Sequence, residues 1–182
     1  MTTSAQNRWV RYTLGVCIAV ALARGAAFAQ EMPAPGPEHE KLKQLEGEWI
    51  ATIKSAGEES KGTMTYRMEC GGLWLVSDFR SDFGGQKFQG RGLDGYDSQK
   101  KKYVSVWVDS TSPRPLFVEG DWDAAKKELT MRGEGPGPDG KPVKYKSVSR
   151  KVDADHETFK MYIVGADDKE TEMMTIDYER KK

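Results

Sequence analysis

The sequence feature that most constrains this fold is an alternation of apolar and polar residues in short runs across residues 47–180. The clearest example spans residues 90–109, where two runs flank a polar turn at residues 97–101. A period of two is typical of β-strands that bury one face, and helical spacing is missing from these runs. The pattern therefore predicts an all-β domain.

Ten such runs are separated by short turn segments. They span residues 47–54, 61–70, 72–83, 86–96, 101–110, 115–122, 127–133, 142–152, 156–164 and 170–180. Short connections let neighbouring strands pair in sequence order, and closing a ten-strand meander removes its two exposed edges. We therefore predict an up-and-down antiparallel β-barrel.

A short helix is predicted before the first strand. Pro37 suits the first helical position, and Gly47 can end the helix. Tight turns alternate along the chain with longer loops, so one end of the barrel should be closed and the other should be an open mouth. The helix enters the first strand from the closed end, where Leu42 and Leu45 are expected to plug the barrel.

The N-terminus has the order of a secretory signal peptide. Arg8 and Arg11 precede an apolar run at residues 14–23, and Ala-Phe-Ala follows at residues 27–29. The run is shorter than the roughly 20 residues of a membrane span, although an uncleaved anchor is the alternative. We predict a signal peptide over residues 1–29, a flexible lead over 30–36 and one barrel domain over 37–182. The protein is then expected in the periplasm or outside the cell, without stable membrane insertion.

Charge and cysteine content narrow the function further. The leader holds three arginines and no acids, so its removal leaves 25 basic and 28 acidic residues. This balance does not favour nucleic-acid binding. Cys70 is then the only cysteine, so no intramolecular disulfide can form. We expect Cys70 to be buried as a small hydrophobic residue.

Gly47-Glu48-Trp49 begins the first strand directly after the short helix. This arrangement resembles the signature of the calycin barrels, which include lipocalins and fatty-acid-binding proteins. Those families place a basic residue of the last strand over the tryptophan, and Arg180 matches that residue in position and direction. The resemblance implies that Trp49 and Arg180 together close the barrel.

A second resemblance is more specific. Residues 39–49 (HEKLKQLEGEW), 95–97 (GYD) and 102–109 (KYVSVWVD) resemble the exported bacterial family called domain of unknown function 1579 (DUF1579). The resemblance covers residues 37–180. It implies a calycin-like barrel and export, and it supplies no catalytic residue because the family has no established activity.

Two patterns have some features of cofactor or metal sites, but neither meets the requirements of such a site. Gly90, Gly92 and Gly95 fit the dinucleotide-binding spacing, but a turn and a strand follow instead of a helix N-terminus. We interpret them as glycines that let a barrel strand coil. His39 and His156 are the only histidines and are expected at the surface, and the acidic turns lack EF-hand spacing. We therefore predict no cofactor and no metal.

The polar residues that face the interior are more informative. Strand 101–110 is ambiguous, but Trp107 and Asp109 would be unusual outside, so we place their phase inside. The candidate ligand-binding residues with the inward phase are Tyr66, Ser77, Asp94, Ser105, Trp107, Asp109, Tyr145 and Ser147. A buried polar group without a partner costs about 1–3 kcal/mol, so these groups should bond one another, ordered water or a ligand.

Three functions remain open on this reading. The leading hypothesis is an exported barrel that binds a small, partly apolar molecule, lipophilic or aromatic, in its interior. The alternative is a structural or interaction module with a filled barrel, whose function lies on outward residues such as Trp74, Val76 and Tyr162. The third is a hydrolase-like enzyme that uses Asp94 and Asp109 as a carboxylate pair.

Overall fold

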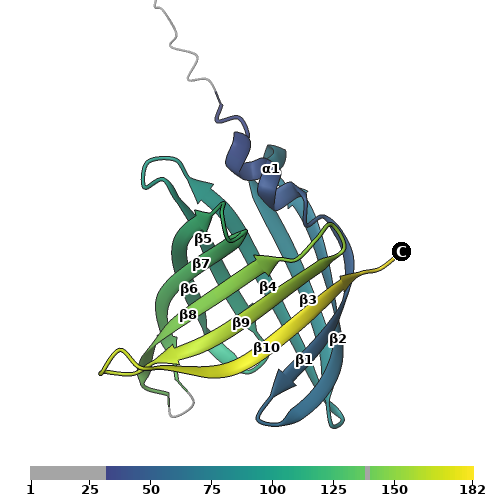
Figure 1. Ribbon diagram of the computed structural model, residues 1–182, viewed down its shortest axis with the longest axis vertical. Helices are drawn as coiled ribbons and strands as arrows, with labels where there is room; N and C mark the ends of the chain where they lie inside the picture. Colours follow the sequence, from purple (N-terminus) through teal and green to yellow (C-terminus); the bar gives the residue numbers. More distant parts are fainter. Residues whose placement is uncertain (1–31, 138–139) are drawn as a thin grey trace, which may run out of the picture. The chain divides into compact units, whose positions relative to one another are not determined.

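The computed structural model describes residues 32–137 and 140–182. The predicted signal peptide lies outside the described residues. Ten antiparallel strands form a closed barrel in which sequence neighbours pair and β1 also pairs with β10 (Figure 1). The predicted up-and-down barrel with one short N-terminal helix is confirmed.

The helix and strands follow the predicted runs with small changes at their ends. The elements are α1 (Pro37–Lys43), β1 (Gly47–Ser55), β2 (Glu58–Glu69), the 3-10 turn η1 (Cys70–Gly72), β3 (Trp74–Phe83), β4 (Gln86–Asp97), β5 (Lys102–Asp109), β6 (Ser112–Asp123), β7 (Glu128–Pro136), β8 (Pro142–Lys151), β9 (His156–Val164) and β10 (Glu170–Arg180).

The interior begins with the inward side chains of β1. Trp49, Ala51 and Ile53 are buried, and they pack with buried residues of β2, β3 and β10 in one core cluster. A second cluster joins Leu42 of α1 to Leu75 and other buried residues. Because Leu42 belongs to this second cluster, the helix is packed onto the barrel by apolar contact.

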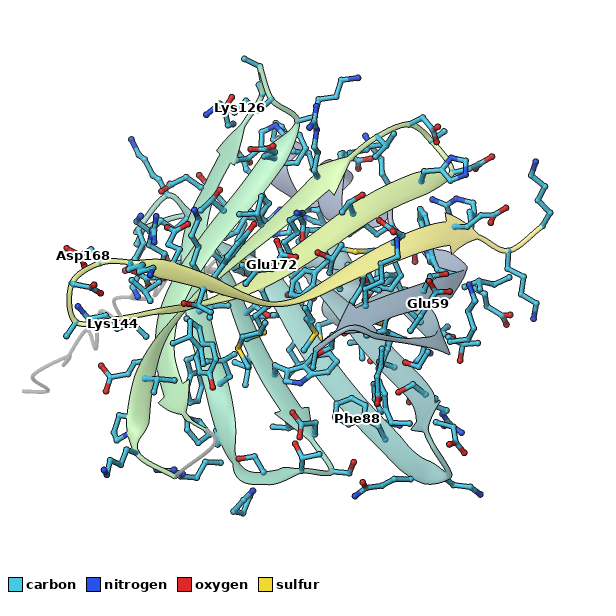
Figure 2. The ribbon with its side chains drawn as sticks, turned by 60° about the horizontal axis from the view of Figure 1, so that its bottom comes forward. Glu59, Phe88, Lys126, Lys144, Asp168 and Glu172 are labelled. Carbon is cyan, nitrogen blue, oxygen red and sulfur yellow. The ribbon has the colours of Figure 1, made fainter. Side chains whose placement is uncertain are left out.

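The two ends of the barrel differ in their connections. η1 and the turns after β4, β6 and β8 lie at the end that α1 covers, which we call the closed end. The other end, the mouth, carries the five remaining hairpin loops. Figure 2 turns the mouth toward the reader, with Lys144 and Asp168 on one side and Glu59 on the other.

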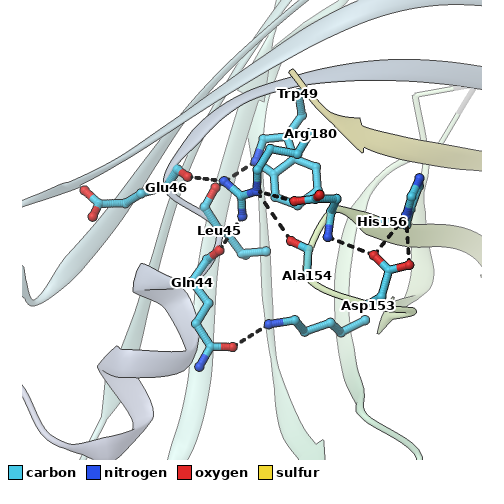
Figure 3. A network of polar contacts seen from close by, with 10 residues as sticks. Gln44, Leu45, Glu46, Trp49, Asp153, Ala154, His156 and Arg180 are labelled. Carbon is cyan, nitrogen blue, oxygen red and sulfur yellow. Dashed lines mark hydrogen bonds and ion pairs between the residues drawn. The ribbon is translucent and has the colours of Figure 1, made fainter. Parts of the chain in front are cut away.

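Trp49 and Arg180 meet at the closed end (Figure 3). They are direct partners in the β1–β10 register, and the Arg180 guanidinium lies 4.1 Å from the centroid of the Trp49 ring. The guanidinium also donates hydrogen bonds to the carbonyl oxygens of Gln44 (2.7 Å) and Glu46, and the Trp49 indole donates one to Leu45 (2.8 Å). One arginine therefore ties the last strand to the segment that links α1 with β1.

Two expectations about this end are wrong. Cys70 is exposed, because the chain leaves the strand at residue 70 and turns with a φ of +52°. His39 is buried, with 8% of its surface exposed. Its Nδ1 accepts a hydrogen bond from the Gly36 backbone N–H at 2.9 Å, and its ring packs edge-on against Tyr96, so this histidine stabilises the start of α1.

Candidate functional site

β5 presents its aromatic face to the interior. Tyr103 is 5% exposed, whereas Val108 on the other phase is 46% exposed. Trp107 packs against the first core cluster, and its indole N–H donates a hydrogen bond to the Asp109 carboxylate at 3.0 Å. The inward phase predicted for Tyr103, Ser105 and Trp107 therefore matches the structure.

Glycines on β4 make room for the Trp107 ring. A Cβ on Gly90 would lie 2.1 Å from the ring, and one on Gly92 would lie 3.3 Å from it. Real Cβ atoms do not approach that closely, so any larger residue at position 90 would displace the ring. The Gly90 and Gly92 pattern thus serves an aromatic wall inside the barrel and not a phosphate.

A group of polar side chains, which we call the deep ring, lies in the interior toward the closed end. Asp94 on β4, Tyr66 on β2, Tyr178 on β10 and Glu157 on β9 all face the interior, and electrostatic interactions among them contribute to their pKa shifts. Ser105, the strand partner of Asp94, donates a hydrogen bond to its carboxyl group. Within the part of the chain that the structure describes, Glu157 has no hydrogen-bond partner for its carboxyl group.

Burial governs the protonation of this ring. It raises the pKa of Asp94 to about 6, and the Ser105 hydrogen bond limits that rise. It raises the pKa of Glu157 to about 7, where nearby Lys151 opposes the shift and Asp94 adds to it. The pKa values of Tyr66 and Tyr178 are also raised by burial, so both phenols stay neutral at physiological pH.

The inward residues of the barrel wall are buried to different extents. The inward residues of β1 and β3 are buried against one another in the two core clusters. On β8 and β9, by contrast, several inward residues keep accessible surface. They are Ser147, Ser149, Glu157, Phe159, Met161 and Ile163. Phe159 packs against the first core cluster, so this part of the wall combines partly accessible polar and apolar side chains.

The remaining predicted residues lie at other levels of the interior. Ser77 is buried beside Gly92, and Ser147 on β8 pairs with Met161 on β9. Tyr145 is closer to the mouth and donates a hydrogen bond to the Pro136 carbonyl at 2.7 Å. Burial raises the pKa of this phenol, and the Asp109 charge adds to the rise.

The structure does not bring Asp94 and Asp109 together. Asp94 pairs with Ser105 and Asp109 with Gly90, so four strand positions separate the two acids. At about 3.3 Å per residue, that is roughly 13 Å along the barrel. The acid that lies near Asp94 is Glu157, which the sequence analysis missed. Extending the alternation of Phe159 by one step toward the start of β9 would have placed Glu157 inside.

Two buried hydroxyl groups near the mouth are unsatisfied. Among the described residues, Ser60 on β2 and Ser81 on β3 have buried side-chain oxygens with no hydrogen-bond partner. Both share the inward phase of their strands, at positions next to Gly62. Polar groups without partners therefore occur at both levels of the interior, near the mouth and in the deep ring.

The outer wall carries a separate apolar row. Val76, Leu93, Val106 and Phe117 are successive cross-strand partners on β3 to β6, and Phe117 is 59% exposed. Two hollows on the outer wall, of about 380 Å³ and 850 Å³, are lined mainly by charged and polar side chains of β5 to β9. Neither hollow contains a residue of the deep ring.

Within the described ranges, no helix is both long and apolar enough to cross a membrane. In the same ranges, no three His, Cys, Asp or Glu side chains come together as metal ligands would.

A comparison with protein families decides the relationship of this chain, because one family matches residues 34–180. The chain belongs to DUF1579, described as a protein of unknown function. The family predicted from the sequence is confirmed, and the match spans α1 and all ten strands. A comparison with curated proteins gives no match.

Solved structures share the fold of this DUF1579 protein. Rv2717c from M. tuberculosis aligns with a TM-score of 0.61 and 13% identity, covering 81% of this chain and 99% of that one. The S-type phycobiliprotein lyase CPES from Guillardia theta aligns with a TM-score of 0.53 and 7% identity, covering 80% and 93%. At these identities the likeness shows the calycin-like barrel and nothing about activity.

Proposed function

We propose that this DUF1579 protein is exported and binds one small, partly apolar molecule inside its barrel. The observation that carries the proposal is the part of the wall formed by β8 and β9, where inward polar and apolar side chains keep accessible surface. Phe159, Met161 and Trp107 would contact the apolar part of the molecule. Polar groups lie above and below them, which suits a ligand with an apolar body and a polar end.

The polar groups support the proposal energetically. Ser60 and Ser81 near the mouth have buried side-chain oxygens with no hydrogen-bond partner among the described residues. Leaving such groups unpaired costs about 1–3 kcal/mol each, and a ligand that bonds to them recovers part of that cost. A closed barrel of eight to ten strands has room for one small ligand beside its side chains.

Native mass spectrometry of the protein purified from its own host tests both halves of the proposal. We expect the chain mass to correspond to a protein that begins at Gln30, because Ala-Phe-Ala precedes that residue. We also expect an additional mass of a few hundred daltons that is lost on unfolding, roughly the size of molecule that such pockets enclose. A full-length chain in the membrane fraction would refute the predicted cleavage.

A fluorescent apolar dye provides a test that does not require the natural ligand. An environment-sensitive dye should bind the folded protein with a stoichiometry of about one and a blue-shifted emission, because the barrel offers one apolar interior. Trp107→Ala should weaken binding by at least about 1 kcal/mol, since the change removes the largest aromatic wall of that interior.

The control for this experiment is Trp74→Ala. Trp74 lies on the outer wall over Gly95, where a Cβ would come within 2.8 Å of its ring, as Trp107 lies over Gly90 inside. The two substitutions remove the same side chain from opposite faces of the barrel. Dye binding that depends on Trp74 and not on Trp107 would exclude the interior site.

That outcome would favour a second candidate, an interaction module. The observation in its favour is the outer row of Val76, Leu93, Val106 and Phe117, because exposed cross-strand apolar rows are uncommon on solvated sheets. A row of this kind on a barrel wall suits a second copy of the chain. Light scattering at increasing protein concentration would then give a dimer that Phe117→Asp dissociates.

A further inference from the structure

We propose that the molecule held in the barrel is an organic cation, such as an apolar amine, whose charged group lies between Asp94 and Glu157 and whose apolar part extends toward Trp107. This inference rests on the proposed function and adds the charge and the orientation of the ligand. The juxtaposition of two inward acids across the barrel carries it.

Asp94 and Glu157 face each other from opposite walls. In the order of strands around the barrel, β4 and β9 are separated by four strands in either direction. Both residues lie near the closed end, since Asp94 pairs with Ser105 and Glu157 pairs with Tyr178 and Lys151. The two acids are close enough that the charge of Asp94 acts on Glu157. A group at the bottom of the interior would therefore have a carboxyl on each side.

One basic group, Lys151, acts on Glu157, and none acts on Asp94. Lys151 is the base that acts on Glu157, and its ammonium group is engaged by the Gln44 side chain at 2.6 Å beside the helix. Burial and the Ser105 hydrogen bond account for the pKa shift of Asp94, and no basic residue contributes to that shift. The surrounding phenols of Tyr66, Tyr178 and Tyr103 have pKa values raised by burial, so they stay neutral and add no positive charge.

This arrangement indicates which charge the ligand should carry. Buried carboxylates are costly unless a cation or several hydrogen bonds offset them. An ammonium group would bond to one carboxylate and be attracted by the other in a site where such interactions are strong, and its alkyl carbons would contact Phe159, Met161 and Trp107. An anionic ligand would be repelled by both acids. A neutral one would leave them either unpaired or protonated.

Three probes that share the same octyl chain distinguish a cationic, a neutral and an anionic ligand. Octylamine, octanol and octanoate differ only in the polar end, so isothermal titration of each into the purified protein at pH 8 compares charge at constant apolar area. We expect octylamine to bind about tenfold or more tighter than octanol, which matches the strength of a charge-assisted hydrogen bond. Octanoate should bind most weakly.

Acidification should remove this preference. Octylamine stays protonated at pH 5, whereas carboxyl groups with pKa values of about 6 and 7 take up protons there. Octylamine affinity should therefore fall about tenfold or more from pH 8 to pH 5, and octanol affinity should not change. Near pH 6.5, octylamine binding should release protons, which appears as a heat that depends on the ionisation enthalpy of the buffer.

Matched variants locate the effect. Glu157→Gln and Asp94→Asn keep the shape of each side chain and remove its charge, so each should cut the preference for octylamine over octanol by about tenfold while octanol still binds. The control is Glu179→Gln, because Glu179 is an exposed glutamate on the neighbouring strand β10. Its removal should leave the preference unchanged.

The outcomes distinguish this inference from the proposed function. If octanol and octylamine bind equally, or if the charge-removing variants keep the preference, the ligand is not a cation and the binding function survives. If octanoate binds most tightly, the sign is reversed and the inference is wrong. If none of the three probes and no apolar dye binds, the interior is filled, and both the proposed function and this inference are overturned.

Discussion

Trp49→Ala should lower the free energy of unfolding by about 3–5 kcal/mol, the usual cost of deleting a large buried aromatic side chain. Trp49 is 3% exposed and belongs to the core cluster that joins β1 to β10. Its loss also leaves the Leu45 carbonyl without the indole donor and the Arg180 guanidinium without an aromatic face. Urea denaturation followed by circular dichroism measures the change.

Arg180→Ala should cost less than Trp49→Ala. The guanidinium loses a cation–π contact worth about 0.5–2 kcal/mol and its hydrogen bonds to the Gln44 and Glu46 carbonyls. The double variant should be more stable than the sum of the two single losses implies, because both substitutions remove the same contact. Trp74→Ala is the matched control for size and should cost less, since that ring is on the outside. Strict additivity of Trp49→Ala and Arg180→Ala would show that the stack does not stabilise the closed end.

Glu157→Gln should stabilise the protein at pH 8 by about 3 kcal/mol and have little effect at pH 4. The ordinary glutamate pKa of 4.5 is raised to about 7 in the folded chain. Between these values the folded protein keeps a proton that the unfolded chain has released, so folding grows less favourable as pH rises through this window. A shift of about 2.5 units corresponds to about 3.4 kcal/mol, and glutamine does not titrate.

Unfolding curves at half-unit steps from pH 4 to pH 8 test this prediction. The wild-type and Glu157→Gln stabilities should coincide near pH 4 and diverge until about pH 7.5. Glu179→Gln, an exposed change one strand away, should follow the wild type within about 0.5 kcal/mol. Parallel curves for wild type and Glu157→Gln would mean that this carboxyl group is solvated in the folded state. Asp94→Asn should act in the same direction over a lower pH range, because burial raises the Asp94 pKa to about 6.

The two predictions concern groups near the closed end that have opposite effects on stability. Trp49 and Arg180 stabilise the closed end, and the acids just inside that end reduce stability at neutral and alkaline pH. Proteins commonly retain such unfavourable groups where a ligand binds. If the ligand is a cation, octylamine at pH 8 should stabilise the wild type and not Glu157→Gln, which links the stability measurement to the binding measurement.

The local pattern of the sequence was sufficient for the strands and their order. β9 and β10 have the predicted bounds, because alternation with turn residues on both sides is a local signal. Short connections between the strands allow few sheet topologies. Closure of the barrel could be predicted because an open sheet would leave two unpaired edge strands. Periodicity alone could not identify the partner of Trp49, because Arg180 lies 131 positions away in the sequence. The resemblance to calycin barrels indicated that a basic residue of the last strand covers this tryptophan.

The sequence was less informative where a residue's surroundings depend on distant strands. Both faces of β5 are apolar, since Val104, Val106 and Val108 alternate with aromatic residues, and only closure of the barrel decided which face is inside. His39 and Cys70 were misjudged because burial at the closed end depends on how α1 and η1 pack against other elements. Neither packing is visible in local composition.

The sequence by itself therefore determined the barrel, its closed end and most of the inward residues, because these depend on spacing along one strand. Only the tertiary structure separated Asp94 from Asp109 and placed Glu157 opposite Asp94. The same closure left the β8–β9 wall accessible while it packed β1 and β3. Which side chains meet across a barrel depends on strand number and register around the whole circumference, and no short stretch of sequence contains that information.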